Sequence, residues 1–298
     1  MSCTSGRLQT HPYTERVPEL PEVETVRRAL MSVLPGAGLE HVEIRDPRLV
    51  RPFDPTIVAD ALVGERIADV GRRGKYLIVW FDSGRSLLVH LRMTGSLRVA
   101  ERGRLAVDPH TRAVLRLDNG SDVAYRDVRR FGTWELFEAG DLRPYLEERL
   151  GPEPLGPLTA IDLGMRLEGR RAPIKSALLD QRRIAGLGNI YVDEALWISR
   201  IHPLRPAGSL QAAELRSLHR AIRRVLRRAI ERQGSTLRDY AQPDGSYGSM
   251  QDEFSAYGRG GEPCDRCASP LIRIVVGGRA TVYCTSCQSA ATATRAGP

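Results

Sequence analysis

Residues 17–28 concentrate groups that could do chemistry at the start of one predicted helix. Pro18 is followed directly by Glu19, and a second such pair, Pro21 and Glu22, lies three residues further on. Apolar residues at three- and four-residue spacing predict the helix, and a proline and carboxylates suit its first turn. A proline at a chain terminus would carry a secondary amine that titrates near pH ~8, so it would be a nucleophile at neutral pH. An ordinary capped helix start explains the same residues, so this stretch alone leaves both interpretations open.

Four cysteines near the C-terminus have the spacing of metal ligands. They form two Cys-x-x-Cys pairs separated by sixteen residues, at Cys264, Cys267, Cys284 and Cys287. Four thiolates so placed can surround one Zn²⁺ tetrahedrally, and short apolar strands on either side of Gly277 and Gly278 predict a β-hairpin between the pairs. Such a zinc is structural, because protein ligands fill every coordination position. Arg279 follows the predicted turn, where a guanidinium can reach a phosphate group.

The composition narrows the class of partner. The 298 residues carry 44 Lys and Arg against 36 Asp and Glu, a formal charge of +8. This excess favours a polyanionic partner, most simply nucleic acid, although basic chains are also common in arginine-rich genomes. No apolar run approaches the roughly 20 residues of a membrane span, so we expect a soluble protein. The paired cysteines favour metal ligation in a reducing cytosol over a disulfide framework.

The elements that must position these groups fall into two parts. Short strands are predicted across residues 38–137, with Asp118-Asn119-Gly120 as a hairpin turn, and they suggest a β-sandwich after the first helix. Residues 151–157 hold three prolines and two glycines and predict an interdomain linker. Beyond the linker the pattern is helical, and the predicted elements are helices at 174–180, 192–198 and 210–232 and a polar loop at 235–261. We expect the arginines of the last helix to form a solvated face.

Residues 18–25 read Pro-Glu-Leu-Pro-Glu-Val-Glu-Thr, and this stretch resembles the N-terminus of the formamidopyrimidine-DNA glycosylase family. The resemblance extends along the chain. Further motifs occur in the family's order at residues 74–77, 90–95, 127–132, 174–175, 186–191 and 257–264. They include Gly-Leu-Gly-Asn-Ile-Tyr before a predicted helix and Tyr-Gly-Arg ahead of the first cysteine pair. The chain is therefore similar to this family from residue 18 to residue 287.

The resemblance implies an α+β multidomain fold. Its parts are an N-terminal helix with a β-sandwich, a helical helix–two-turns–helix (H2TH) domain and a C-terminal β-hairpin zinc finger. The implied boundaries are an extension at 1–17, a catalytic sandwich domain at 18–150, a linker at 151–158, the H2TH domain at 159–261, the zinc finger at 262–290 and a tail at 291–298. A loop that reads the lesion is expected within residues 235–256 of the H2TH domain.

The activity that this resemblance implies is that of a bifunctional DNA glycosylase and AP lyase of base excision repair. The Pro18 amine would attack C1′ of the damaged nucleotide, displace the base and form an iminium, and β- and δ-elimination would cut the strand. Glu19 would act as acid and base at the sugar oxygen, and Glu22 would orient and balance the charge around Pro18. Lys75 and Arg279 complete the implied catalytic set. The substrates would be oxidised purines, 8-oxoguanine and formamidopyrimidines, and the chemistry would need no cofactor beyond the structural Zn²⁺.

The implied DNA-binding residues divide into two groups. Met93, Arg129 and Phe131 would fill the space that the extruded nucleotide leaves, a task that suits apolar wedges and one cation. Phosphate groups would be held by the cationic or amide side chains of Lys75, Lys175, Asn189 and Arg279. The matched motifs add His90 and Tyr191 to the set. The family also implies a monomer that binds damaged double-stranded DNA in the cytoplasm, associated with the nucleoid.

Sixteen residues and Val17 precede Pro18, whereas the family begins at this proline. Translation from a GUG codon at Val17 would resolve the difference, and residues 1–17 would then be absent from the mature protein. Two other functions stay open. An endonuclease VIII-type glycosylase for oxidised pyrimidines would typically carry Gly where this chain has Leu20. A blocked Pro18 would leave a non-catalytic zinc-finger DNA-binding protein.

Overall fold

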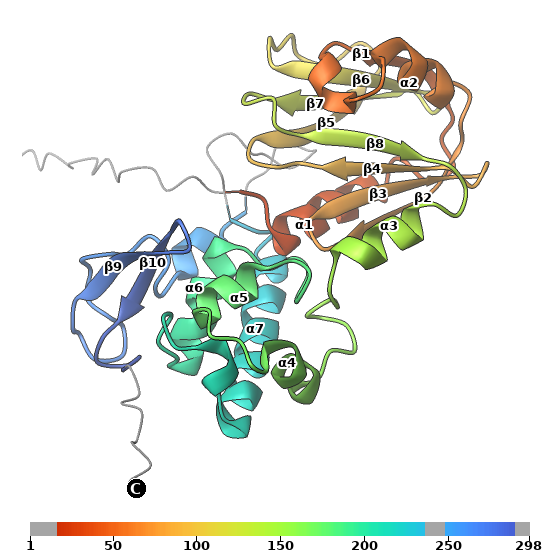
Figure 1. The fold of residues 1–298 in the computed structure, drawn as a ribbon. Helices are drawn as coiled ribbons and strands as arrows, with labels where there is room; N and C mark the ends of the chain where they lie inside the picture. Colours follow the sequence, from red (N-terminus) through yellow and green to blue (C-terminus); the bar gives the residue numbers. More distant parts are fainter. Residues whose placement is uncertain (1–16, 236–247, 290–298) are drawn as a thin grey trace, which may run out of the picture.

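Helix α1 (Leu20–Leu30) lies between the two halves of the molecule, as Figure 1 shows, and contributes to the core of each. The computed structural model describes residues 17–235 and 248–289. Glu22 accepts a hydrogen bond from the backbone N–H of Glu19 at 3.0 Å, which fixes the start of the helix. Leu20 is buried in the core of the helical half, whereas Val23 and Val26 are buried in the core of the sandwich. The predicted helix start is confirmed.

The sandwich consists of two four-stranded antiparallel sheets (Figure 1). The order β1-β6-β7-β5 joins strands Leu39–Ile44, Thr111–Leu117, Ser121–Asp127 and Gly95–Glu101. The order β2-β3-β4-β8 joins strands Ile67–Arg73, Tyr76–Phe81, Ser86–His90 and Thr133–Phe137. Residues of both sheets and of α1 share one core. Gly120, with φ of +83°, closes the predicted hairpin between β6 and β7, and the predicted β-sandwich is confirmed.

Three short helices accompany the sandwich and were not predicted. They are η1 (Pro47–Val50), α2 (Pro55–Leu62) and α3 (Leu142–Arg149). α2 carries an ordinary start signal, since the Asp54 side chain accepts the Thr56 N–H at 2.8 Å and Pro55 begins the helix.

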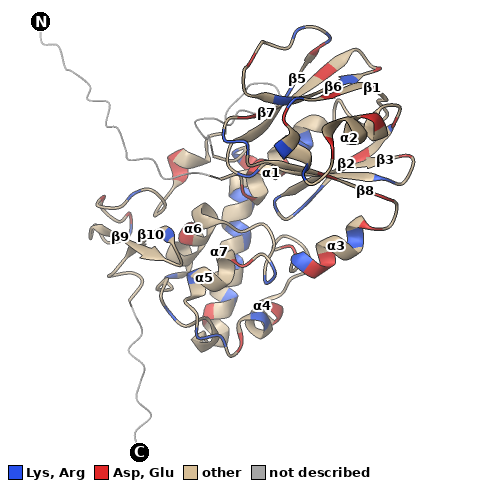
Figure 2. Ribbon diagram, turned by 45° about the horizontal axis from the view of Figure 1, so that its top comes forward, with Lys and Arg blue, Asp and Glu red and all other residues tan. Residues whose placement is uncertain are grey.

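A second core lies among four helices, here called the helical unit. They are α4 (Ala160–Leu167), α5 (Ile174–Leu179), α6 (Asn189–Ser199) and α7 (Ala212–Glu231), with short turns η2 (Ala207–Ser209) and η3 (Met250–Glu253) beside them. The three predicted helices are confirmed, but α6 begins three residues earlier than predicted. As expected, α7 buries an apolar face and exposes Arg216, Arg220, Arg224 and Arg227. Figure 2 marks the Lys and Arg positions along this helix in blue. No helix among the described residues is both long and apolar enough to cross a membrane.

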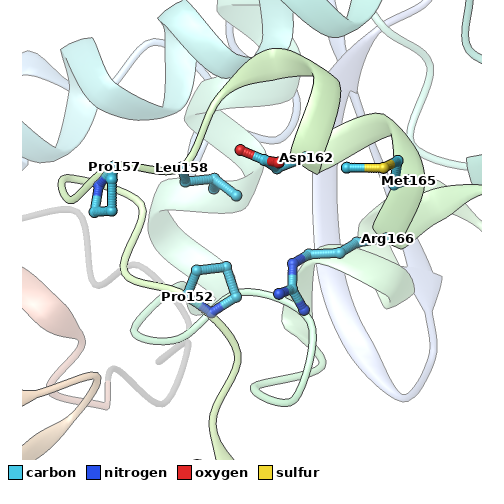
Figure 3. Close-up of a pocket in the computed structure, with 6 residues that line it drawn as sticks. All are labelled: Pro152, Pro157, Leu158, Asp162, Met165 and Arg166. Carbon is cyan, nitrogen blue, oxygen red and sulfur yellow. The ribbon is translucent and has the colours of Figure 1, made fainter.

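The linker between the halves is held by ion pairs at Glu153. Its carboxylate accepts hydrogen bonds from the Arg72 guanidinium at 3.0 and 3.1 Å and from the Gly74 N–H at 2.5 Å. Arg72 also donates to Glu24 of α1 at 3.2 Å, so linker, sheet and helix share one charged cluster. Beside the same linker a surface pocket opens against α4 (Figure 3), lined by Pro152, Pro157, Leu158, Asp162, Met165 and Arg166.

The C-terminal hairpin brings the four cysteines together. Strands β9 (Leu271–Val276) and β10 (Arg279–Cys284) pair antiparallel, and the turn uses Gly277 and Gly278 at φ of +55° and +74°. The four cysteine Sγ atoms all lie within 4.8 Å of one another. Tetrahedral Zn–S bonds of about 2.3 Å place sulfur atoms ~3.8 Å apart, so the cluster fits one Zn²⁺. The predicted hairpin is confirmed.

Removal of zinc should unfold the hairpin and leave the helical unit folded. The hairpin shares only a small core with Trp197 and Ala256, whereas α4–α7 enclose a separate and larger one. Hydrogen exchange of chelated protein should show loss of protection in β9 and β10 and unchanged protection in α7. Added Zn²⁺ should restore the protection, and protected β9 and β10 amides in zinc-free protein would contradict this account.

Candidate active site

A cleft of about 780 Å³ opens where the sandwich, the helical unit and the hairpin meet. Both halves supply predicted site residues to its wall, namely Glu19, Lys75, His90, Met93, Phe131, Asn189 and Arg279. Pro18 is buried, and its two chain neighbours, Val17 and Glu19, both line the cleft. The start of α1 therefore forms part of the cleft wall.

The Glu19 carboxylate lies against the N-terminus of α6. It accepts hydrogen bonds from the backbone N–H groups of Ile190 at 2.9 Å and Tyr191 at 3.4 Å. This contact needs glycine at position 188, because a Cβ there would lie 2.2 Å from the Glu19 Cδ and displace the carboxylate. Burial raises the pKa of Glu19 to about 7, although the nearby Lys75 ammonium opposes the rise. A carboxyl group that titrates near neutral pH can donate and accept protons, as acid–base catalysis requires.

Lys75 occupies the turn between β2 and β3 and lines the same cleft. Gly74 precedes it with φ of +60°, and a Cβ at that position would lie 3.3 Å from the Cβ of Ala185, so the turn packs closely against the helical unit. Burial lowers the pKa of the Lys75 ammonium, and the carboxyl groups of Glu19 and Glu22 oppose this shift. Burial thus raises the pKa of the Glu19 carboxyl group and lowers that of the Lys75 ammonium, so the two values lie closer together than in water.

Glu22 is fully buried beneath the start of α1. It accepts hydrogen bonds from the Tyr191 hydroxyl at 2.5 Å, the Ser235 N–H at 2.9 Å and the Glu19 N–H at 3.0 Å. These donors belong to α6, to the segment after α7 and to the residue that follows Pro18. The carboxylate therefore joins α6, the segment after α7 and the start of α1, an arrangement that suits its predicted orienting role. Tyr191 is buried in this network, and its predicted contact with DNA stays a prediction.

Two loops at the cleft carry the predicted wedge residues. Met93 follows β4, and Arg129 and Phe131 lie between β7 and β8. The Phe131 ring is 50% exposed, with the Arg129 guanidinium 5.0 Å from its centroid. Asp127 accepts a hydrogen bond from the Thr94 hydroxyl, and the Thr94 oxygen accepts the Arg129 N–H at 2.9 Å. These bonds connect the two loops, so the exposed Phe131 ring and the Met93 thioether lie together at the edge of the cleft.

His90 lines the cleft as a neutral imidazole. Its Nδ1 accepts the Arg92 N–H at 2.9 Å, and its ring packs edge-on against Tyr76 with centroids 4.7 Å apart. Burial, with Arg92 and Lys75 nearby, lowers the pKa of His90 to about 3. The proton of the neutral ring is assigned to Nε2, because Nδ1 is an acceptor. His90 can thus donate a hydrogen bond without adding a charge.

Lys175 and Asn189, predicted to hold phosphate groups, are hydrogen-bonded to the hairpin in this structure. The Lys175 Nζ is fully buried and donates to Asp193 at 2.6 Å and to the Ala280 carbonyl oxygen at 2.9 Å. The Asn189 Nδ2 donates to the same carbonyl oxygen at 3.0 Å. Phosphate contacts by these two residues stay a prediction. Arg279, the residue before Ala280, lines the cleft.

Some residues of the cleft were not predicted. Tyr257 and Arg273 line it, and Gln181 lines it and also accepts the Gly186 N–H at 2.8 Å, ahead of α6. Tyr257 stands within a matched motif, which was a usable signal, whereas Gln181 and Arg273 have no pattern of their own. Most of the predicted lesion-reading loop, residues 236–247, lies outside the described residues.

Three family models match the chain in order. The formamidopyrimidine-DNA glycosylase N-terminal domain matches residues 17–134, and the H2TH domain of the same family matches residues 150–241. A zinc finger found in FPG and IleRS matches residues 261–290. This match and the clustered thiols together establish one structural Zn²⁺ as the cofactor, as the cysteine spacing predicted.

Whole-chain comparisons agree with these matches. A formamidopyrimidine-DNA glycosylase of Herpetosiphon aurantiacus is 46% identical over 277 residues, which cover 92% of this chain and 100% of that protein. Lactococcus lactis Fpg, solved in complex with DNA containing an abasic site, gives a TM-score of 0.85 at 38% identity, covering 91% of this chain and 100% of that one. MutM (Fpg) of Thermus thermophilus gives a TM-score of 0.81 at 44% identity, covering 91% and 98%. The chain belongs to the formamidopyrimidine-DNA glycosylase family.

Proposed function

We propose that this chain is a DNA glycosylase and AP lyase of base excision repair that removes oxidised purines from double-stranded DNA. The observation that carries the proposal is the Glu19 carboxyl group, which lines the cleft beside Pro18 with a pKa of about 7. Similar proteins have been solved with the expected substrates: Lactococcus lactis Fpg variants with Fapy-dG DNA, and MutM with DNA containing carbocyclic 8-oxo-G. We expect the protein to act as a monomer on nucleoid DNA in the cytoplasm.

Pro18 is the proposed nucleophile, which requires a mature chain that begins at this residue. The family match starts at residue 17, and 92% of this chain accounts for the whole length of the Herpetosiphon aurantiacus protein. The start of the family match at residue 17 supports translation from Val17, and we propose that Val17 is then removed. A free Pro18 nitrogen would be a secondary amine, and the next residue, Glu19, is held in place because its N–H donates to the buried Glu22 carboxylate.

In the proposed reaction the Pro18 amine forms a bond to C1′ of the damaged nucleotide. The bond from C1′ to the base breaks, and the base leaves with the bonding electrons and takes up the proton that the Pro18 nitrogen loses. Glu19 protonates the sugar ring oxygen as the ring opens, which leaves an iminium between Pro18 and C1′. Loss of a proton from C2′ then expels the 3′ phosphate, and loss of a proton from C4′ expels the 5′ phosphate.

The other proposed roles follow from position in the cleft. The Phe131 ring and the Met93 thioether would enter the duplex, and Arg129 would hydrogen-bond in the space left by the nucleotide. Lys75 and Arg279 would place positive charge next to the phosphates, and His90 would donate a neutral hydrogen bond.

Oxidised pyrimidines are a second candidate substrate class. A Lactococcus lactis Fpg that is 38% identical to this chain has been solved with DNA containing an oxidised pyrimidine. Leu20, the residue that departs from the endonuclease VIII-type start, is fully buried in the core of the helical unit. Its side chain therefore packs the fold and is unsuited to reading the base directly, and oxidised pyrimidines stay an alternative substrate class for the same cleft.

Reduction with borohydride during turnover should trap the protein on DNA. With a duplex containing 8-oxoguanine, we expect one covalent adduct whose peptide map places the sugar on Pro18, and an intact mass for free enzyme that starts at Pro18. A chain made to retain residues 1–17 is the matched control and should bind the duplex without forming an adduct. An adduct on that control, or tight binding with no adduct by the protein that begins at Pro18, would refute the proposed nucleophile.

Replacement of Glu19 by Gln should separate chemistry from binding. The amide oxygen still accepts the hydrogen bonds of α6, but the group no longer exchanges a proton, so the single-turnover excision rate should fall by about 10²–10⁴. Affinity for a duplex with a stable abasic-site analogue should be unchanged. Glu24→Gln on the same helix removes a carboxylate that pairs with Arg27, Arg28 and Arg72, and should leave the excision rate near that of the wild type. Equal rates for Glu19→Gln and the wild type would exclude the proposed acid–base role.

A further inference from the structure

A buried ion pair outside the proposed chemistry connects the hairpin to the helical unit. The side chains of Lys175 on α5 and Asp193 on α6 are 0% and 1% exposed, and the Lys175 Nζ lies 2.6 Å from Asp193 Oδ1. Each partner has a second contact, and both contacts are to the backbone of β10. Lys175 donates to the Ala280 carbonyl oxygen at 2.9 Å, and Asp193 Oδ2 accepts the Val282 N–H at 3.1 Å.

The pair is better suited to setting geometry than to adding stability. Burying two charges costs the free energy of their hydration, and the attraction between them offsets little more than that cost. Such pairs therefore contribute little to the free energy of folding. Here the ammonium and the carboxylate each satisfy one backbone group of the same strand, two residues apart. That arrangement fixes the distance of β10 from α6 and the position of the strand along the helix.

Other contacts dock the same end of the hairpin. The Asn189 Nδ2 donates to the Ala280 carbonyl oxygen at 3.0 Å. The turn also approaches α5 closely, since a Cβ at Gly277 would lie 2.8 Å from the Ser176 Oγ. Arg279 is the residue between this turn and Ala280, so its backbone is held from both sides while its side chain lines the cleft.

We propose that Asp193, with Lys175, is a positioning residue that sets the place of Arg279 in the cleft. The inference rests on the proposed function, in which the Arg279 guanidinium binds the DNA backbone. It assigns Lys175 a different role from a direct phosphate contact: its ammonium holds the Ala280 carbonyl, and the DNA contact falls to the neighbouring arginine. Asp193 touches neither DNA nor the reacting atoms and acts through Arg279.

A double-mutant cycle between Asp193 and Arg279 tests this assignment. The variants are Asp193→Asn, Arg279→Ala and the two combined, and the measurement is affinity for a duplex with a tetrahydrofuran abasic-site analogue. We expect Asp193→Asn to weaken binding by about tenfold in the wild-type background and to have little further effect once Arg279 is Ala, because coupled residues are not additive. Equal fold-losses from Asp193→Asn in both backgrounds would overturn the proposal.

A control variant separates positioning from general destabilisation. Glu214→Gln breaks a partly buried ion pair of the helical unit, with Arg205 at 2.7 Å, far along the chain from the hairpin. It should lower the melting temperature without weakening binding in either background. All variants are compared at one zinc per chain. If Asp193→Asn alone loses zinc or its cooperative melt, the cycle is repeated with Asp193→Asn/Lys175→Gln, which leaves no unpaired charge.

Two kinds of failure remain distinguishable. If Arg279→Ala binds the duplex as tightly as the wild type, both this inference and the proposed DNA contact of Arg279 are wrong. Arg279→Ala with weakened affinity, combined with an independent effect of Asp193, would overturn the positioning role alone and leave the proposed function standing.

Discussion

The contact between the Glu19 carboxyl group and the N-terminus of α6 is the interaction on which the site depends. Its partners are 171 residues apart in the chain, and they meet only because Gly188 lacks a side chain. Burial favours the neutral acid, whereas the Lys75 ammonium and the backbone N–H groups of Ile190 and Tyr191 favour the charged carboxylate. The two effects leave a group that titrates at about pH 7 beside the proposed nucleophile. Either effect alone would give a carboxyl group useless for exchanging protons at neutral pH.

Helix α1 positions Glu19 for this contact because its apolar residues anchor the helix and its polar residues make the hydrogen bonds at its start. Leu20 enters one core and Val23 and Val26 enter the other, so hydrophobic burial fixes the helix between the two halves. Buried charges add little net stability, and they serve here to orient groups. Glu22 accepts hydrogen bonds from Glu19, Tyr191 and Ser235, and Asp193 accepts one from the hairpin strand that carries Arg279. The Zn²⁺ maintains that hairpin and has no part in the proposed reaction.

Local patterns predicted much of the fold. The apolar face of α7, the turn at Asp118-Asn119-Gly120 and the cysteine spacing each correspond to an observed element. Helix α2 was missed because residues 38–137 were interpreted as strands throughout, although Pro55 suits a first turn. The contacts of the site are of another kind. Lys175 and Ala280 are 105 residues apart, and neither segment carries a pattern that indicates the other. The family resemblance named residues such as Lys175 and left out partners such as Asp193, which only the folded chain reveals.

The protonation of Glu19 in the folded protein tests the central claim most directly. Carbon-13 labelling of glutamate side chains, with Glu19→Gln to assign the signal, would give the titration of this carboxyl group by NMR. The account predicts a midpoint near pH 7, with the protonated acid present below it and lost as pH rises, and a higher midpoint when Lys75 is replaced by Met. A midpoint near the ordinary value of 4.5 would contradict the account.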